Sequence, residues 1–127
     1  MKLDYTRTSE KEFDRVVSGI ERAAGDRQFR VLHIHDVKAT LGEKGFERGP
    51  LKIIEICSAK FAHKALEINE DVALFMPCKI NVYTKNGKTV ISAARPDMIS
   101  EFFPQPELKK LAGEVDNIVR SIVDEVC

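Results

Sequence analysis

The spacing of apolar residues near the start of the chain predicts a short strand followed by a helix. Residues 3–7 alternate between apolar and polar side chains, as in a strand with one covered face. Ser9 and Glu12 have the spacing of a capping box, which predicts that a helix begins beside them. Apolar residues then recur at helical spacing until Gly25 ends the helix: Phe13, Val16, Val17, Ile20 and Ala24.

Two more strands and two helices are predicted in the middle of the chain. The strands are Phe29–His35 and the β-branched run Leu51–Cys57. Asp36 is placed to cap a short helix after the first strand, and Ser58 to cap a helix that reaches Asn69 after the second. The apolar arc of this second helix leaves His63 outside it and consists of Phe61, Ala62, Ala65, Leu66 and Ile68.

A long strand and a returning strand form the clearest hairpin. Apolar side chains occupy every second position from residue 72 to residue 82, which predicts one continuous strand. Asn86-Gly87 suits a two-residue turn because both central positions need a positive φ. This turn predicts three cross-strand pairs, and Pro96 ends the returning strand. The predicted pairs are Val82 with Ile91, Ile80 with Ala93, and Cys78 with Arg95.

The last element is a long amphipathic helix over residues 106–126. At 1.5 Å per residue its length is roughly 30 Å, enough to lie across a small domain. Its predicted buried residues are Leu108, Leu111, Val115, Ile118 and Ile122. Strands and helices that alternate, then a hairpin and a terminal helix, favour an α+β fold over a doubly wound parallel sheet.

Composition restricts the class of protein. A chain of 127 residues without repeats or linkers predicts one domain over residues 1–127. Twenty basic and twenty acidic residues give zero net charge, which argues against nucleic acid as a partner. No apolar run has the length of a membrane span and no signal peptide begins the chain, so we expect a cytoplasmic protein without a membrane partner.

Several segments carry a resemblance to a known family. They are His35–Leu41, Gly45–Phe46, Ile53–Cys57, Ala62–Leu66 and Leu74–Tyr83. The chain resembles a bacterial and archaeal family catalogued as a domain of unknown function, the three-hundred-and-second of that series. The resemblance implies a fold like that of the TATA-box-binding protein, with a curved, mainly antiparallel sheet and a long helix, often in a homodimer. This chain has Cys57-Ser58-Ala59 where the family usually continues Cys-Asn-Pro.

Two cysteines are the first candidates for chemistry, and the resemblance points to the same positions. Cys57 and Cys78 could act as a thiol pair, or could bind copper or zinc with Met76 or His63. They could equally be small buried apolar residues. His33 and His35 share one strand face but have no evident third ligand, so no metal or other cofactor is expected under the leading interpretation.

The predicted register leaves open whether the thiol of Cys78 is protonated at neutral pH. A guanidinium from Arg95 directly across the hairpin would favour the thiolate and lower the pKa of Cys78, whereas burial would raise it. Alternatively, Arg95 could extend to a carboxylate and leave Cys78 an inert core residue.

No local motif of an enzyme is present, so a non-catalytic function is favoured. We expect a homodimeric module that binds a small ligand between the curved sheet and its helices, at a site that includes Cys57, Met76, Cys78, Arg95 and His63. Exposed Tyr83 and Val90 are candidates for the dimer surface. The alternative is a thiol-dependent redox protein or a copper- or zinc-binding protein that uses Cys57 and Cys78.

Overall fold

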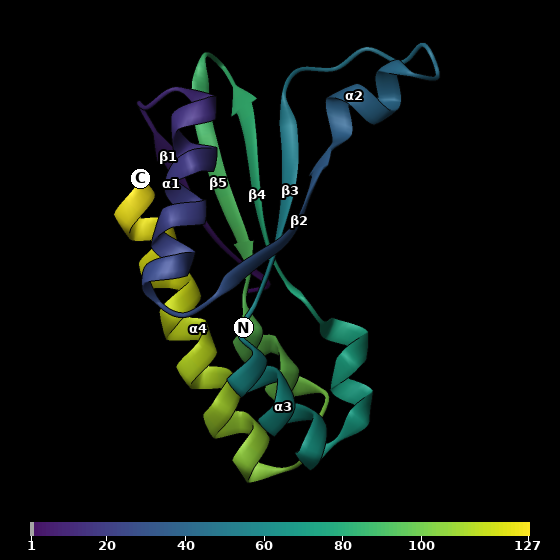
Figure 1. Cartoon of the computed structure of the whole chain (residues 1–127), viewed down its shortest axis with the longest axis vertical. Helices are drawn as coiled ribbons and strands as arrows, with labels where there is room; N and C mark the ends of the chain where they lie inside the picture. The colour runs from purple at the N-terminus through teal and green to yellow at the C-terminus, as the bar shows by residue number, and fades with distance from the viewer. Residues whose placement is uncertain (1) are drawn as a thin grey trace.

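Five antiparallel strands form one sheet in the order β1-β5-β4-β3-β2, and helices cover one of its faces (Figure 1). The computed structural model describes residues 2–127. Its elements are β1 (Asp4–Ser9), α1 (Phe13–Asp26), β2 (Arg30–Asp36), α2 (Val37–Gly42), β3 (Leu51–Cys57), α3 (Ala59–Ile68), the 3-10 helix η1 (Glu70–Phe75), β4 (Cys78–Lys85), β5 (Lys88–Ala94), the 3-10 helix η2 (Pro96–Glu101) and α4 (Pro106–Val126). The predicted α+β class with a long C-terminal helix is confirmed.

The main core lies between this sheet and the helices α1 and α4. Strand side chains alternate between the two faces, and the branched residues that face the helices are fully buried. They pack against the apolar stripes of α1 and α4. The largest strand residues in this layer are Ile54, Ile56, Ile80, Val82 and Ile91.

The helix α4 has the predicted bounds and, with one exception, the predicted buried face. Leu108, Leu111, Val115 and Ile122 are buried, whereas Ile118 is only half-buried at the edge of the core. The helix extends beyond the sheet, so its first turns pack against η2 and α3. The lower part of the molecule in Figure 1 is therefore a second, smaller layer of helices.

The hairpin turn and its register as far as Ile80 and Ala93 are confirmed, but the third predicted pair, Cys78 with Arg95, and the long first strand are not. Asn86 and Gly87 adopt φ angles of 53° and 76°, and Ile80 pairs with Ala93 as predicted. Residues 70–75 form η1, and β4 begins only at Cys78. The pairing of β4 with β3 ends at Cys78 and Ile56, so earlier residues have no strand partner on that side.

Two predicted helix caps do not form as expected. Ser9 is the last residue of β1; its hydroxyl donates to the carbonyl of Cys127 and accepts the amide of Lys11, so no capping box starts α1. Ser58 occupies the N-cap position of α3, but its side chain does not cap the helix. Asp36 does cap α2 by accepting the amide of Ala39 at 3.0 Å.

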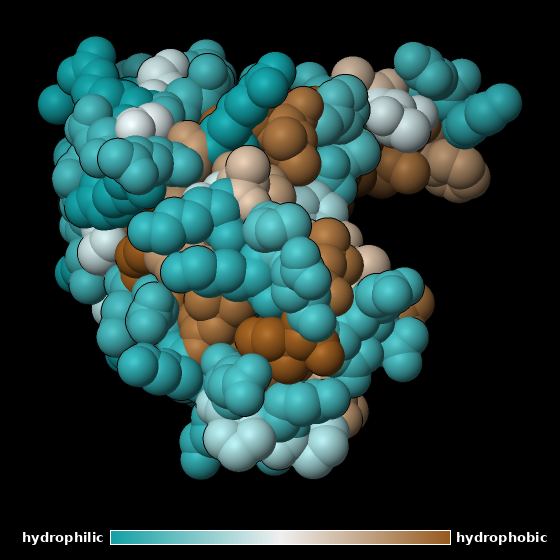
Figure 2. All heavy atoms as spheres, turned by 60° about the horizontal axis from the view of Figure 1, so that its bottom comes forward, coloured by the Kyte–Doolittle hydropathy of each residue, from teal (hydrophilic) through white to brown (hydrophobic). Residues whose placement is uncertain are grey.

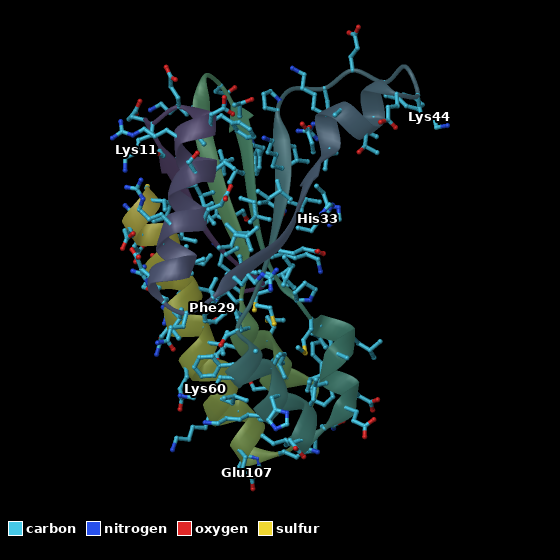
Figure 3. All side chains as sticks on the ribbon, in the orientation of Figure 1. Lys11, Phe29, His33, Lys44, Lys60 and Glu107 are labelled. Atoms are coloured by element: carbon cyan, nitrogen blue, oxygen red, sulfur yellow. The ribbon has the colours of Figure 1, made fainter. Side chains whose placement is uncertain are left out.

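The helix α2 and the loop that follows it project from the rest of the molecule, beyond the end of β2 (Figure 1). None of the residues of α2 is buried. Figure 3 places Lys44 near the outer end of this segment. None of the helices within residues 2–127 is long and apolar enough to cross a membrane.

On the face of the sheet that the helices leave uncovered, the predicted exposure of Val90 is wrong. Val90 is buried, with 7% of its surface exposed, and Tyr83 is half-buried. Val90 lies between Thr8 of β1 and Tyr83 of β4, whose side chains flank it on this face. Val90 is therefore not an exposed apolar residue.

Candidate functional site

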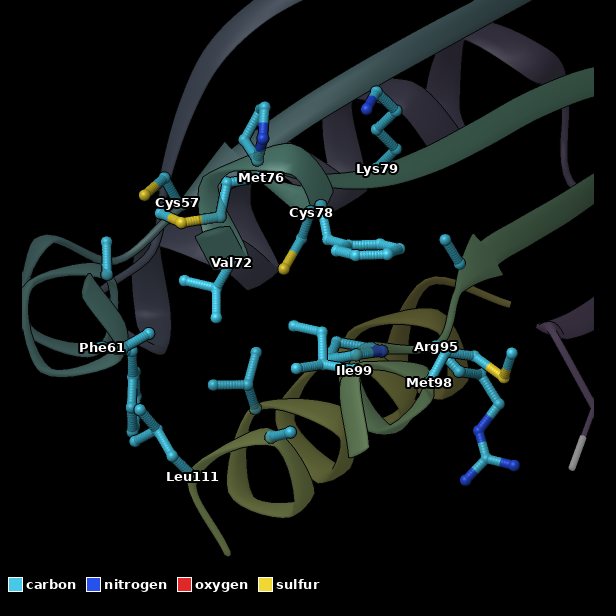
Figure 4. A pocket seen from close by; sticks show the side chains of 18 of the residues that line it. Cys57, Phe61, Val72, Met76, Cys78, Lys79, Arg95, Met98, Ile99 and Leu111 are labelled. Carbon is cyan, nitrogen blue, oxygen red and sulfur yellow. The ribbon is translucent and has the colours of Figure 1, made fainter. Parts of the chain in front are cut away.

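A cavity of about 390 Å³ lies where the end of β3 and the start of β4 meet the second layer of helices (Figure 4). Its walls come from α3, η1, η2 and the first half of α4. The volume falls within the range of small-molecule sites, roughly 300–1,000 Å³. The cavity is thus a candidate ligand site between the sheet and its helices.

The wall of the cavity is mainly apolar. Aromatic side chains contribute from several elements: Phe29, Phe61, Phe75 and Phe102. The rings of Phe75 and Phe102 stack with their centres 5.4 Å apart, which joins η1 to the end of η2. The charged residues along the described wall are Lys79 and Arg95, and both are cations.

Sulfur atoms from two strand ends and the preceding loop also line this wall. Cys57, Met76 and Cys78 all contact the cavity, and the side chain of Cys78 points into it in Figure 4. A thioether is flexible and polarisable, so it adapts to the shape of an apolar or aromatic ligand. Together with Arg95, four of the five predicted site residues therefore line the cavity, and His63 does not.

Both cysteines of the cavity hold their protons at neutral pH. Burial raises the pKa of Cys57 above its ordinary value. Burial also raises the pKa of Cys78 to about 11, with a smaller contribution from Cys57, whereas Lys79 acts in the opposite direction. A neutral thiol is a poor nucleophile and a poor metal ligand.

The predicted approach of Arg95 to Cys78 is wrong. The backbone of Cys78 pairs with Ile56, while β5 ends at Ala94 and the amide of Arg95 bonds to the carbonyl of Leu3. Figure 4 shows the guanidinium of Arg95 turned away from Cys78. The alternative interpretation, that Arg95 reaches a carboxylate, is confirmed.

That carboxylate belongs to Asp116, which is 1% exposed within α4. Arg95 donates to both of its oxygens, from Nε at 3.2 Å and from Nη2 at 3.0 Å. The backbone amide of Asp97 and Nε of Arg120 also lie within 3.3 Å and 3.0 Å of Asp116. The bonds to Asp116 raise the pKa of Arg95 and fix η2, one wall of the cavity, against α4.

The three histidines of the chain lie outside the cavity. His63 is on the exposed side of α3, with Nε2 3.3 Å from the carboxylate of Glu67. His33 and His35 lie on β2 with ring centres 4.3 Å apart, and Nε2 of His35 is 3.3 Å from Glu55. In the part of the chain that is described, no group of three or more His, Cys, Asp or Glu side chains is arranged to hold a metal ion.

Sequence reasoning missed the exposed apolar mouth of the cavity. Four of the seven large apolar residues that are exposed in the described chain also line the cavity: Leu3 (63% exposed), Leu74 (83%), Phe75 (43%) and Phe102 (62%). Figure 2, which brings the lower end of Figure 1 forward, shows an apolar patch surrounded by hydrophilic side chains. In the sequence, the run of apolar residues on either side of Pro77 was a signal that could have indicated this mouth.

The fold and the cavity define a small α+β protein with an apolar site at one end of its sheet. The chain belongs to the family described as "Domain of unknown function DUF302", which matches residues 5–126. It is similar to the crystal structure of an uncharacterized conserved DUF302 protein from Bacillus stearothermophilus. That similarity has a TM-score of 0.94 and 28% identity, and covers 100% of both chains. A search of curated proteins gives no match.

Proposed function

We propose that this protein binds a small apolar molecule in the cavity, without catalysing a reaction on it. The observation that carries the proposal is an apolar cavity whose mouth is formed by exposed Leu74, Phe75 and Phe102. Exposing such side chains to water is unfavourable, and a bound apolar ligand would cover them. Polar groups along the wall are few, as in sites that bind mainly through apolar contact.

Fluorescence titration tests this function. N-phenyl-1-naphthylamine is a neutral apolar dye that becomes fluorescent when it leaves water, and we expect the protein to bind it. Ala65→Trp fills the cavity from α3 and should abolish the binding, as should the smaller change Ala62→Phe. Ala39→Trp, on exposed α2, is the matched control. Absence of dye binding, or equal binding by a folded cavity-filled variant, would contradict the proposal.

A thiol-dependent or soft-metal function is the second candidate. The observation that favours it is that Cys57, Met76 and Cys78 line one cavity. The raised pKa of both thiols opposes it, because thiolates bind copper and zinc. Elemental analysis of protein purified without a histidine tag separates the candidates: bound copper or zinc at one equivalent would favour this function.

We also propose that the protein forms a homodimer. The strand β2 is at the edge of the sheet and carries Leu32, which is 52% exposed, and the segment after α2 carries Phe46, which is 64% exposed. A second copy could pair with this edge and cover both side chains. Zero net charge means that two copies do not repel each other strongly.

A further inference from the structure

Two stacked pairs of phenylalanine rings line the cavity. Phe29 and Phe61 stack with their ring centres 6.0 Å apart and also pack against the main core. Phe75 and Phe102 stack at the mouth, where both side chains are exposed. Each ring of this second pair covers only one face of the other, so ring surface remains free at the mouth. A further aromatic ring could extend this stack, because offset aromatic rings attract one another beyond the effect of buried area.

Sulfur atoms from four side chains of the described chain line the same cavity: Cys57, Met76, Cys78 and Met98. Sulfur is polarisable and makes favourable contacts with the edge of an aromatic ring, which a saturated ring does not offer. The thiol of Cys78 points into the cavity and keeps its proton at neutral pH, because burial raises its pKa to about 11. A protonated thiol is a weak donor that can approach the negative face of an aromatic ring. The wall therefore favours an aromatic ring over a saturated ring of the same size.

Within residues 2–127, the wall of the cavity offers no free charge to a ligand. Its charged residues are Lys79 and Arg95. Both oxygens of Asp116 accept hydrogen bonds from the guanidinium of Arg95. Lys79 is exposed and lies across from Glu55 in the pairing of β3 with β4, and Figure 4 shows its ammonium directed away from the cavity. Because burying a charged group without a partner is costly, the cavity is suited to an uncharged ligand.

We propose that the ligand is an uncharged aromatic compound whose ring packs among these phenylalanine and sulfur-bearing side chains. This inference rests on the proposed function, since it names the class of ligand for the same cavity. Substituted benzenes and naphthalenes without an ionised group belong to this class. Fatty acids and saturated cyclic hydrocarbons do not, because the first carry a charge and the second lack a ring that stacks on Phe75 and Phe102.

The experiment compares two uncharged alcohols that differ only in the saturation of one ring. Hydrocinnamyl alcohol and cyclohexylpropanol, its analogue with a saturated ring, are each used to displace N-phenyl-1-naphthylamine from wild-type protein, Phe102→Leu and Phe46→Leu. The dye affinity of each variant is measured first, so that displacement gives a Kd for each alcohol. Phe102→Leu removes one ring of the stack at the mouth, whereas Phe46→Leu makes the same change outside the cavity. Phe102 and Phe46 are 62% and 64% exposed, so both variants should fold normally.

A cavity that binds through apolar burial alone would bind the saturated alcohol at least as tightly as the aromatic one, because the saturated ring buries more apolar surface. We expect wild-type protein to prefer the aromatic alcohol instead, by about threefold to tenfold, the usual range of aromatic contacts beyond burial. Phe102→Leu should reduce this preference, and Phe46→Leu should leave it unchanged. Equal or weaker binding of the aromatic alcohol, or a preference that Phe102→Leu does not reduce, would overturn the aromatic class while leaving apolar binding intact. Failure of the dye itself to bind wild-type protein would instead overturn the proposed function.

Discussion

Arg95 and Asp116 form a two-point ion pair that joins η2 to α4, with nitrogen-to-oxygen distances of 3.2 Å and 3.0 Å. Asp116 is 1% exposed and Arg95 follows directly after β5, so the pair connects the sheet, the cavity wall and the long helix. A buried carboxylate is stable only when charged or polar groups compensate it. Asp116 thus sets the position of η2.

Removing either partner of this pair should destabilise the fold. Arg95→Ala leaves the buried carboxylate of Asp116 with less compensation, and we expect a loss of about 3 kcal/mol in the free energy of unfolding. Urea denaturation measures it. Arg7→Ala is the matched control, because its ion pair with Asp124 is about half-exposed and should contribute at most about 1 kcal/mol. An equal loss of stability in the two variants would show that the buried ion pair of Arg95 stabilises the fold no more than the half-exposed pair of Arg7.

Val115→Asp should lower the melting temperature sharply. Val115 is 9% exposed and packs in the main core, so the substitution puts an unpaired carboxylate there at a cost of several kcal/mol. Asn117→Asp introduces the same side chain on the exposed face of α4 and should have little effect. Thermal unfolding followed by circular dichroism compares the two variants. An unchanged melting temperature for Val115→Asp would mean that the buried face of α4 is wrongly assigned.

Cys78 should make the stability of the protein depend on pH in the alkaline range. The unfolded chain loses the thiol proton near pH 9.0, whereas the folded chain keeps it until about pH 11. The raised pKa therefore stabilises the fold fully below pH 9.0, and this stabilisation decreases as the pH rises towards 11. The shift corresponds to about 3 kcal/mol.

Cys78→Val isolates this contribution from that of other groups that titrate at alkaline pH. Denaturant titrations from pH 8 to pH 11 should show a smaller loss of stability in the variant than in wild-type protein. Parallel slopes would show that Cys78 titrates normally. On single-cysteine variants, Cys78 should also react more slowly with iodoacetamide than Cys127 at pH 8.

Light scattering tests the proposed homodimer. At micromolar concentration the mass should be twice the 14.3 kDa of one chain. Phe46→Ser should shift it towards the monomer without unfolding the protein, because Phe46 is 64% exposed in one copy. Leu66→Ser, which changes an exposed apolar residue on α3, is the control. A monomer mass for wild-type protein would exclude the dimer under these conditions.

The elements that depend on local sequence could be predicted closely. Asn86 and Gly87 favour a two-residue turn by their residue types alone, and the apolar spacing of residues 106–126 fits a helix and hardly any other structure. Residues 72–76 could not be assigned this way, because alternate apolar positions also occur in a short 3-10 helix whose Val72 is buried. The information needed is non-local, because β3 ends at Cys57 and therefore offers no strand partner to residues 72–76.

The candidate site could be predicted only in part, because some of its contacts join elements that are far apart in the sequence. Cys57 and Cys78 end and begin neighbouring strands, so their nearness follows from the strand order. The partner of Arg95 is 21 residues away in another element, beyond the reach of hairpin register. A signal for Asp116 did exist, since it lies at helical spacing from the apolar residues Ala112 and Val119. The likeness to the TATA-box-binding protein stays a prediction.

The most direct test of ligand binding in the cavity uses Met76 and Met98, the methionines of residues 2–127 that line it. Protein labelled with ¹³C at the methionine methyl groups is titrated with N-phenyl-1-naphthylamine, and nuclear Overhauser contacts from the dye are recorded. Binding in the cavity predicts contacts from the aromatic ring of the dye to the methyl groups of Met76 and Met98, and the loss of these contacts in Ala65→Trp. Saturation of the dye signal without contacts to either methyl group would contradict it.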